Sequence, residues 1–392
     1  MVRKDSESSC SSDDSHNAED YSLANDAVVT KYQVAAEITN AVLKEVIANI
    51  KEGAVVGDLC DLGDKLILER TGKLYKKEKN FTKGIATPTC ISVDNCICHY
   101  TPLRSEAPIV LKAGQVVKVD LGTHIDGLIA TAAHTVVVGA SKDNKITGPV
   151  ADLIRGTYEA LEIAIRSLRP DTLNQDITKN IDKTAAEFGV TPIENMLSHQ
   201  LERNEIDGEK KIIQNPGEKQ RGEIEKVKIE KHEAYAVDIL FTSGKGKPKD
   251  MDTRTTVYRK NESVTYQLKM KASRVFFADV NKQHGPMPFT LRGLEEEVKA
   301  KMGVVECEKY GLLIPYPVLY EKEGEIVAQF KATVLVMPNG LLKIAGLPFD
   351  TDVYQSDITV KDPELQAVLK SALKPKKKKE AKKDESAAAK KA

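Results

Sequence analysis

The chain of 392 residues contains no tryptophan, and only 5% of its residues are aromatic. It lacks an apolar run of about 18 residues, the minimum for a transmembrane helix, so we expect no membrane insertion. The first residues, M-V-R-K-D-S-E-S-S-C-S-S-D-D-S-H, have no apolar core of the kind that a secretory signal needs. A net charge is also missing, because 58 basic residues balance 58 acidic ones. If the charge is spread evenly, this balance argues against a strongly basic nucleic-acid binder.

Cysteine is sparse and irregularly spaced. The six cysteines are Cys10, Cys60, Cys90, Cys96, Cys98 and Cys307. Without a secretory signal the chain is expected in a reducing compartment, where disulfides are rare. Cys96 and Cys98 stand two residues apart, but a metal site would show a second such pair. We therefore expect plain buried or half-buried thiols and no cofactor.

Hydrophobic periodicity predicts helices and strands in alternating groups. Apolar residues at three-to-four spacing predict helices over 28–50, 58–72, 149–168 and 173–189, the second capped by Asp58. Strands are predicted at 116–120, 127–138, 234–241 and 326–336, the first two joined by the loop G-T-H-I-D-G. Helix pairs that alternate with hairpins favour an α/β or α+β body with an antiparallel-rich sheet. Neither standard kind of Gly-rich phosphate loop is present.

Charge is distributed unevenly along the chain. Residues 1–20 carry a net charge of −4, 245–274 carry +6 and 374–392 carry +6, which leaves −8 for the rest. The acidic N-terminal stretch has almost nothing to bury and is expected to be disordered. The C-terminal block repels itself and is expected to be unfolded, either as a nuclear-import or polyphosphate-docking segment or as a solubilising tail. Its leading lysines are Lys374, Lys376, Lys377, Lys378 and Lys379.

A basic insertion at 245–274 interrupts the regular order of the elements. Its basic residues outnumber its acidic ones nine to three. They are Lys245, Lys247, Lys249, Arg254, Arg259, Lys260, Lys269, Lys271 and Arg274. Because basic groups neutralise phosphates and Tyr258 and Tyr266 offer faces for stacking on bases, the stretch predicts an RNA-binding surface. The plainer alternative is a solvated hairpin with strands near 254–259 and 264–269.

Five separated motifs resemble those of type II methionine aminopeptidases. They are I-A-T-P-T-C-I-S-V-D-N-C-I-C-H-Y-T-P (85–102), V-K-V-D-L-G-T-H-I-D-G-L-I-A-T (117–131), M-L-S-H-Q (196–200), A-Y-A-V-D (234–238) and V-A-Q-F-K-A-T-V-L (327–335). The resemblance covers roughly residues 26–355. It implies the pita-bread fold, in which two pseudo-symmetric halves surround a dinuclear metal site.

In that family two Asp, one His and two Glu hold the metal pair. The resemblance places these ligands at Asp120, Thr131, His199, Asp238 and Lys331, and a vestigial substrate-facing histidine at His99. Four carboxylates would balance two divalent cations, but Asp120, Asp238 and Lys331 supply a net charge of only −1. An ammonium has no lone pair to offer, and the carboxylates that bridge two cations are largely gone. We therefore predict no dinuclear site and no aminopeptidase activity.

The surviving ligand residues need another explanation. We hypothesise that the Lys331 ammonium stands where a cation stood and pairs with Asp120 or Asp238, because an unpaired buried carboxylate is costly. The alternative is a single metal ion on Asp120, His199 and Asp238.

One group of pita-bread proteins that lacks the metal site is a closer match. The phrases that carry it are V-V-T-K-Y (28–32), M-L-S-H-Q-L (196–201), I-D-G-E-K (206–210), I-I-Q-N-P (212–216), M-G-V-V-E-C (302–307) and L-Y-E-K-E-G-E (319–325). Together with the basic insertion and the Lys-rich tail, they resemble the proliferation-associated protein 2G4 family, also called the ErbB-3 receptor-binding proteins. The match is nearly full length.

That resemblance implies a non-catalytic, growth-linked factor of the cytoplasm, the nucleus and the nucleolus. It implies docking on the large ribosomal subunit and its rRNA near the tunnel exit, with roles in ribosome biogenesis and translation regulation. Structured mRNA and nuclear proteins are further candidate partners, and a monomer is expected. Family members can carry an L-x-x-L-L co-regulator box, but the matching stretch L-Q-A-V-L (365–369) has Val368 at the fourth position.

These predictions divide the chain into three parts. They are a disordered acidic segment (1–25), a pita-bread domain (26–355) that contains the basic insertion, and a C-terminal segment (356–392) that ends in the Lys-rich tail. The expected function is RNA and ribosome binding without catalysis. Two alternatives are a residual metal-dependent methionine aminopeptidase and a protein-interaction module, such as a transcriptional co-regulator, that uses the old substrate pocket.

Overall fold

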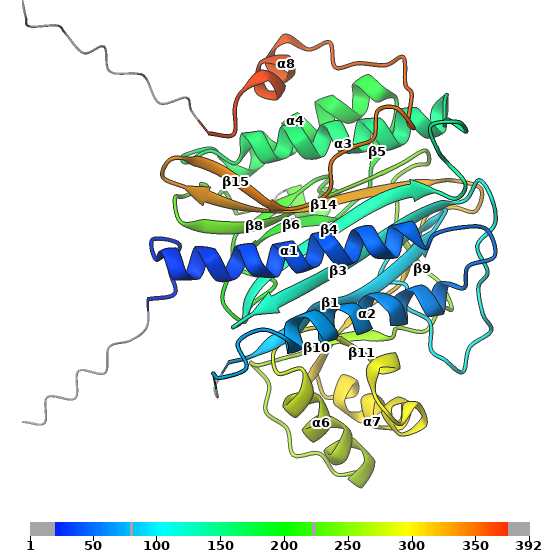
Figure 1. The fold of residues 1–392 in the computed structure, drawn as a ribbon, viewed down its shortest axis with the longest axis vertical. Coiled ribbons are helices and arrows are strands. Elements are labelled where there is room, and N and C mark those ends of the chain that lie inside the picture. Colours follow the sequence, from blue (N-terminus) through cyan, green and yellow to red (C-terminus); the bar gives the residue numbers. More distant parts are fainter. Residues whose placement is uncertain (1–19, 79–80, 222–224, 375–392) are drawn as a thin grey trace, which may run out of the picture.

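The computed structural model describes residues 20–78, 81–221 and 225–374, and its helices lie over one large sheet and beside it (Figure 1). The helices are α1 Asp26–Ala48, α2 Val56–Gly72, α3 Pro149–Ser167, α4 Asn174–Phe188, α5 Glu218–Arg221, α6 Lys271–Gln283, α7 Glu297–Lys309 and α8 Pro363–Lys370, with a 3-10 turn at Leu291–Gly293. The strands are β1 Lys83–Val93, β2 Cys96–Cys98, β3 Val116–Ile125, β4 Leu128–Val137, β5 Thr191–Pro192, β6 Leu197–Leu201, β7 Lys211–Ile213, β8 Glu233–Thr242, β9 Lys249–Asp250, β10 Val257–Lys260, β11 Phe289–Thr290, β12 Leu313–Tyr316, β13 Leu319–Tyr320, β14 Val327–Met337 and β15 Gly340–Ala345.

The large sheet has nine strands in the described part of the chain, and all its pairings are antiparallel. Its main path is β1-β3-β4-β14-β8-β6-β7, with β15 beside β14 and β5 beside β8. Strands β4 and β14 meet at the middle, where Lys331 lies opposite Ala133. The sheet therefore joins a first half, built before residue 140, to a second half built later, as the sequence predicted.

The two predicted helix pairs cover one face of this sheet. Helices α1 and α2 contact β1, β3 and β4, and α3 contacts β8 and β14 with α4 packed beside it. Val119 and Leu121 of β3 belong to the core under α1 and α2, and Val237 and Ile239 of β8 belong to the core under α3. Since side chains along a strand alternate between faces, Asp120 and Asp238 must point to the opposite face.

The predicted helices and strands are present with small changes at their ends. Asp58 does not cap α2, because the N-cap is Val55, which makes no side-chain cap hydrogen bond. The expected loop over 122–127 is also wrong, since β3 continues to Ile125 and β4 begins at Leu128. Only Asp126 and Gly127 turn, both with positive φ (55° and 77°), which matches the twist of the strands in a two-residue hairpin.

The basic insertion is longer than 245–274, and it does not form the simple hairpin considered above. The chain between β8 and β14 includes α6, α7 and several short strands, and β10 pairs with β11 and β12 instead of with 264–269. Leu268 packs with Phe276, Phe289 and Val304 in a separate apolar core. The stretch 264–269 therefore packs against the two helices and shields their apolar faces from water.

Arg292, in the 3-10 turn of the insertion, ties this region to the body of the protein. Its side chain is 3% exposed. It donates hydrogen bonds to the Asp61 carboxylate (Nε–Oδ1 2.8 Å) and to the carbonyl oxygens of Pro102 (2.8 Å) and Gly57. A buried guanidinium that donates to several acceptors is fixed in place. Arg292 therefore holds the insertion against α2.

The two ends of the described chain pack more than expected. Leu23 is buried and the Arg203 guanidinium lies 3.7 Å from the centre of the Tyr21 ring, so the prediction of disorder up to residue 25 is wrong from residue 20 onward. At the other end, Leu365 of α8 is fully buried in a cluster with Ile163 and Phe188, with Val368 and Leu369 packed against it. The L-Q-A-V-L stretch therefore turns its apolar side into the protein's own core. The remaining tail residues, Lys376 to Lys379 among them, lie outside the described residues, as does Cys10.

Two further sequence predictions can be compared with the fold. The five described cysteines are buried free thiols, as predicted. No helix among residues 20–78, 81–221 and 225–374 is both long and apolar enough to cross a membrane.

Candidate functional site

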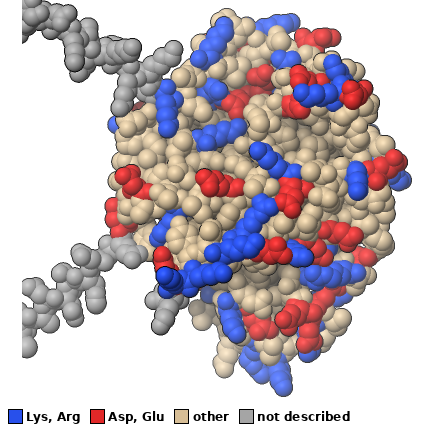
Figure 2. All heavy atoms as spheres, in the orientation of Figure 1, with Lys and Arg blue, Asp and Glu red and all other residues tan. Residues whose placement is uncertain are grey.

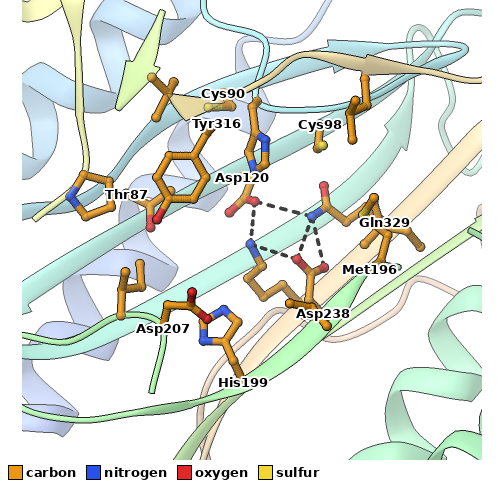
Figure 3. A pocket seen from close by; sticks show the side chains of 18 of the residues that line it. Thr87, Cys90, Cys98, Asp120, Met196, His199, Asp207, Asp238, Tyr316 and Gln329 are labelled. Carbon is orange, nitrogen blue, oxygen red and sulfur yellow. Dashed lines mark hydrogen bonds and ion pairs between the residues drawn. The ribbon is translucent and has the colours of Figure 1, made fainter. Parts of the chain in front are cut away.

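A cavity of about 260 Å³ lies on the sheet face opposite the helices. Asp120 of β3, Asp238 of β8 and Lys331 of β14 line it, together with His99, His199 and residues of the insertion such as Tyr316. The register brings them together, because Lys331 is the direct cross-strand partner of Asp238, and Ala133 separates it from Asp120 on the other side. Figure 3 shows Asp120, Asp238 and Gln329 converging on one point.

A buried ion pair with three members fills this point. The Lys331 ammonium lies 2.6 Å from Asp120 Oδ2 and 3.0 Å from Asp238 Oδ2. The Gln329 amide nitrogen donates to both oxygens of Asp238 (3.0 and 3.1 Å) and lies 3.4 Å from Asp120 Oδ2. The three charged residues are at most 9% exposed. The hypothesis that Lys331 pairs with a surviving carboxylate is confirmed, and it pairs with both.

Burial and charge together set the protonation of the site. Burial alone would discharge Lys331, but the Asp120 and Asp238 carboxylates overcome it and hold the pKa of the amine well above its usual value. Burial raises the pKa of Asp238 to about 6, helped by the nearby Asp120 charge and opposed by Lys331. For His199, burial and then the Lys331 charge lower the pKa to about 4, and burial lowers the pKa of His99. Both imidazoles are therefore neutral near pH 7.

The arrangement leaves some polar groups without strong partners. Asp120 Oδ1 is buried and accepts no hydrogen bond from the described residues. The histidines have only long contacts, from His199 Nδ1 to the Gln200 carbonyl oxygen (3.4 Å) and from His99 Nδ1 to that of Pro317 (3.2 Å). The cluster of Asp120, Asp238 and Lys331 carries a net charge of −1, and together with neutral imidazoles and apolar walls it can hold a ligand in place.

The residues of this cavity do not fit two divalent ions. Thr131 is hydrogen-bonded through its backbone N–H to Thr333 Oγ1 (2.9 Å) and does not line the cavity. Lys331 occupies the space between the two remaining carboxylates. Over the part of the chain that the structure describes, no group of three or more His, Cys, Asp or Glu is placed to hold a metal ion. The alternative of a single ion on Asp120, His199 and Asp238 is therefore not supported by this arrangement.

Sequence reasoning missed two contributors to the cavity. Gln329 stands two residues before Lys331 on the same strand, so strand periodicity alone could have placed it on the same face. Asp207 lies at the cavity because Arg259 of the insertion pairs with Glu205 (3.3 Å) and Asp207 (3.4 Å) and holds their loop. That contact joins segments more than fifty residues apart, and no local pattern announces it.

The predicted RNA-binding residues separate into two groups. Arg259 is held by its two carboxylates, and Lys260 pairs with Glu262. The others are exposed and have no carboxylate partner among the described residues. They are Lys245, Lys247, Lys249, Arg254, Lys269, Lys271 and Arg274. Tyr258 is 4% exposed with its hydroxyl bonded to Glu308 (3.2 Å), so it offers no face to a base and that prediction is wrong.

Figure 2 shows how charged side chains are placed on one face of the molecule. On the face viewed in Figure 2, acidic and basic side chains are interspersed above, and basic ones join into a band in the lower half. Local charge, rather than the total, therefore decides which partners this surface attracts.

The centre of this two-half antiparallel sheet carries two carboxylates and one lysine. The model of metallopeptidase family M24 matches residues 30–261. ERBB-3 BINDING PROTEIN 1 of Arabidopsis thaliana is 43% identical over 369 residues, which cover 94% of this chain and 92% of the relative. Proliferation-associated protein A of Dictyostelium discoideum is 42% identical over 352 residues, 90% of each chain.

A solved structure of a thermophilic Arx1 superimposes with a TM-score of 0.84 at 32% identity, covering 90% of this chain and 100% of that one. The chain belongs to metallopeptidase family M24 and, within it, to the ErbB-3-binding and proliferation-associated proteins. The pita-bread architecture expected from the sequence is thereby confirmed.

Replacing Lys331 tests whether the ion pair holds the sheet centre together. Lys331→Met leaves two buried carboxylates without a counter-charge, and we expect it to lower the free energy of unfolding by about 3–5 kcal/mol. The triple variant Lys331→Met, Asp120→Asn, Asp238→Asn removes all three charges and should recover much of this loss. Urea denaturation at pH 7 measures both. A triple variant no more stable than Lys331→Met would show that packing, and not charge, is the main contribution.

His199 should make stability depend on pH in a defined direction. Its pKa is lowered in the folded state to about 4 from 6.5, so its contribution is present above pH 6.5 and is lost as the pH falls toward 4. Other buried groups change the pH dependence of stability in both directions. The quantity to compare is therefore the difference between the unaltered chain and the His199→Gln variant. We expect His199→Gln to reduce the proton uptake on unfolding at pH 5 by about one proton. Urea titrations from pH 4.5 to 7 measure it, and an unchanged slope would contradict the assignment.

Proposed function

We propose that the protein is a non-catalytic RNA-docking factor that binds the large ribosomal subunit near its tunnel exit and acts in ribosome biogenesis and translation regulation. The observation that carries the proposal is the set of seven exposed basic side chains in the insertion that lack a carboxylate partner among the described residues. Free cations of this kind gain most when they replace the counterions of a phosphate lattice. The Arg292 contacts fix the insertion to the body, so these charges are presented on a rigid support.

The absence of catalysis is the second part of the proposal. Hydrolysis in metallopeptidases needs a metal-bound water with a pKa near neutrality. Here the ammonium of Lys331 pairs with both carboxylates and cannot activate water, and both histidines are neutral. The Arabidopsis relative is named as a binding protein. We further propose activity in both cytoplasm and nucleus, including the nucleolus, with the Lys-rich tail as the import signal.

A metal and peptidase assay tests the loss of catalysis. We expect the purified chain to retain no tight divalent ions after dialysis against Co²⁺ or Mn²⁺, and to leave a Met-initiated peptide uncleaved. The variant Thr131→Asp, Asp238→Glu, Lys331→Glu restores the ligand types of the family and should gain divalent-ion binding, measured by elemental analysis. Two tight ions and turnover in the unaltered chain would refute the proposal.

Charge reversal in the insertion tests the RNA part. Lys245→Glu, Lys247→Glu, Lys249→Glu and Arg254→Glu are exposed changes that break no ion pair with a described residue. We expect this variant to lose co-sedimentation with 60S and 80S ribosomes, and the salt dependence of residual binding to fall by up to about 0.9 per lost phosphate contact. Arg259 is left intact, because its loss would release the loop over the cavity.

The matched control reverses four exposed lysines outside the insertion, Lys44, Lys51, Lys112 and Lys145, which have no carboxylate partner among the residues described. The change in net charge is the same. Control and test variants should melt within a few degrees of the unaltered chain, and the control should still sediment with ribosomes. Equal loss by both would mean that total charge matters and the insertion does not.

A further inference from the structure

Two tyrosines stack on each other at one edge of the insertion. The ring centres of Tyr266 and Tyr310 lie 4.0 Å apart with the planes inclined by 10°. Tyr266 belongs to the extended segment before α6, and Tyr310 is the residue that follows α7 and caps it. The pair therefore joins the two sides of the insertion at its surface.

Tyr310 is exposed although the chain has few aromatic residues. At 38% exposure it is the one aromatic side chain among the large exposed hydrophobic residues of the described chain. It is not a member of the apolar core that α6 and α7 enclose, whereas Tyr258 belongs to that core and Tyr266 packs against it. An aromatic ring of this size contributes most when buried, so an open ring held in a fixed orientation is available to a ligand.

One cation lies over the Tyr310 ring, a second lies beside the segment that carries Tyr266, and two nearby acids are already hydrogen-bonded. Lys309 places its amine 5.8 Å from the centre of the Tyr310 ring. Arg274 donates to the carbonyl oxygens of Lys269 (2.6 Å) and Leu268 (3.1 Å), which keeps its guanidinium beside the segment that carries Tyr266. The Glu306 carboxylate accepts the backbone N–H groups of Lys269 and Met270, and Glu308 accepts the Tyr258 hydroxyl.

We propose that the Tyr266–Tyr310 pair is a stacking platform for an unpaired RNA base, with Lys269, Arg274 and Lys309 contacting the flanking phosphates. The proposal rests on the proposed RNA docking and narrows it to a ligand class. Bases inside a duplex are already stacked on both faces, so only a single strand, a loop or an extruded base can reach the ring. Flat rings bordered by lysines are the usual way in which proteins hold single strands without reading their sequence.

An apolar protein segment is the competing ligand, since Val298, Met302 and Val305 are also exposed on α7. The cations at the tyrosines favour RNA, because an apolar partner would have to remove water from them without supplying charge in return. The two ligand classes give different results in the experiment below.

The experiment compares a fluorescent 12-nucleotide single-stranded RNA with a blunt 12-base-pair RNA duplex. The proteins are the full chain, Tyr266→Ala/Tyr310→Ala, and Tyr310→Phe as the matched control that keeps the ring. We expect the double alanine variant to bind the single strand about tenfold more weakly, with duplex binding and the salt slope unchanged. Tyr310→Phe should bind both RNAs as the full chain does. Circular dichroism and melting curves check that the variants fold.

Each outcome has a definite meaning. Unchanged single-strand binding by the alanine variant would overturn the platform, as would equal loss of single strand and duplex. Loss of ribosome co-sedimentation with both RNA affinities intact would assign the tyrosines to a protein contact instead. If the charge-reversed insertion variant also kept its RNA affinity, the proposed function itself would fall. If the charge-reversed variant lost RNA affinity and the double alanine variant kept it, the proposed function would stand and the stacking platform would be rejected.

Discussion

The buried contact of Lys331 with Asp120 and Asp238 is the constraint on which the centre of this structure depends. It lies where the two halves of the sheet meet, and it joins β3, β8 and β14 across that junction. At a separation near 4 Å two unit charges attract by about 4 kcal/mol at an effective dielectric constant of 20, and removing either partner strands a charge in an apolar surrounding. One positive charge from the chain itself thus holds two buried carboxylates together where the halves of the sheet meet.

The cavity on the sheet is lined by apolar residues and two neutral histidines. The insertion between β8 and β14 carries exposed cations that have no carboxylate partner among the described residues. Arg292 holds the insertion against α2, and Arg259 holds the loop of Asp207 over the cavity. The guanidinium groups of these two arginines are buried or half-buried and fix the position of neighbouring segments. The exposed lysines of the same stretch remain available to a polyanion.

Much of the fold could be read from the sequence because its signals are local. The helices over 28–50 and 149–168 and the strands around Asp120 and Asp238 follow from the spacing of apolar residues, which depends only on near neighbours. The candidate site was found because separated motifs resemble those of type II methionine aminopeptidases, and the pairing of Lys331 was inferred from charge balance. The predictions failed where contacts between distant segments determine the structure. The stretch 264–269 resembles a strand but covers α6 and α7, and Tyr258 lies under the basic surface rather than on it.

The sequence by itself determined which residue types remain at the old ligand positions, and therefore that two cations could not be balanced there. It also determined that positive charge is concentrated in an insertion and a tail. The tertiary structure alone decided that one ammonium reaches both carboxylates, that Gln329 bridges them, and that Arg259 and Lys260 are already paired. It alone placed Tyr266 against Tyr310. The reason is physical: charge and periodicity are properties of the chain, whereas burial and pairing depend on which distant segments meet, and that follows only from packing in three dimensions.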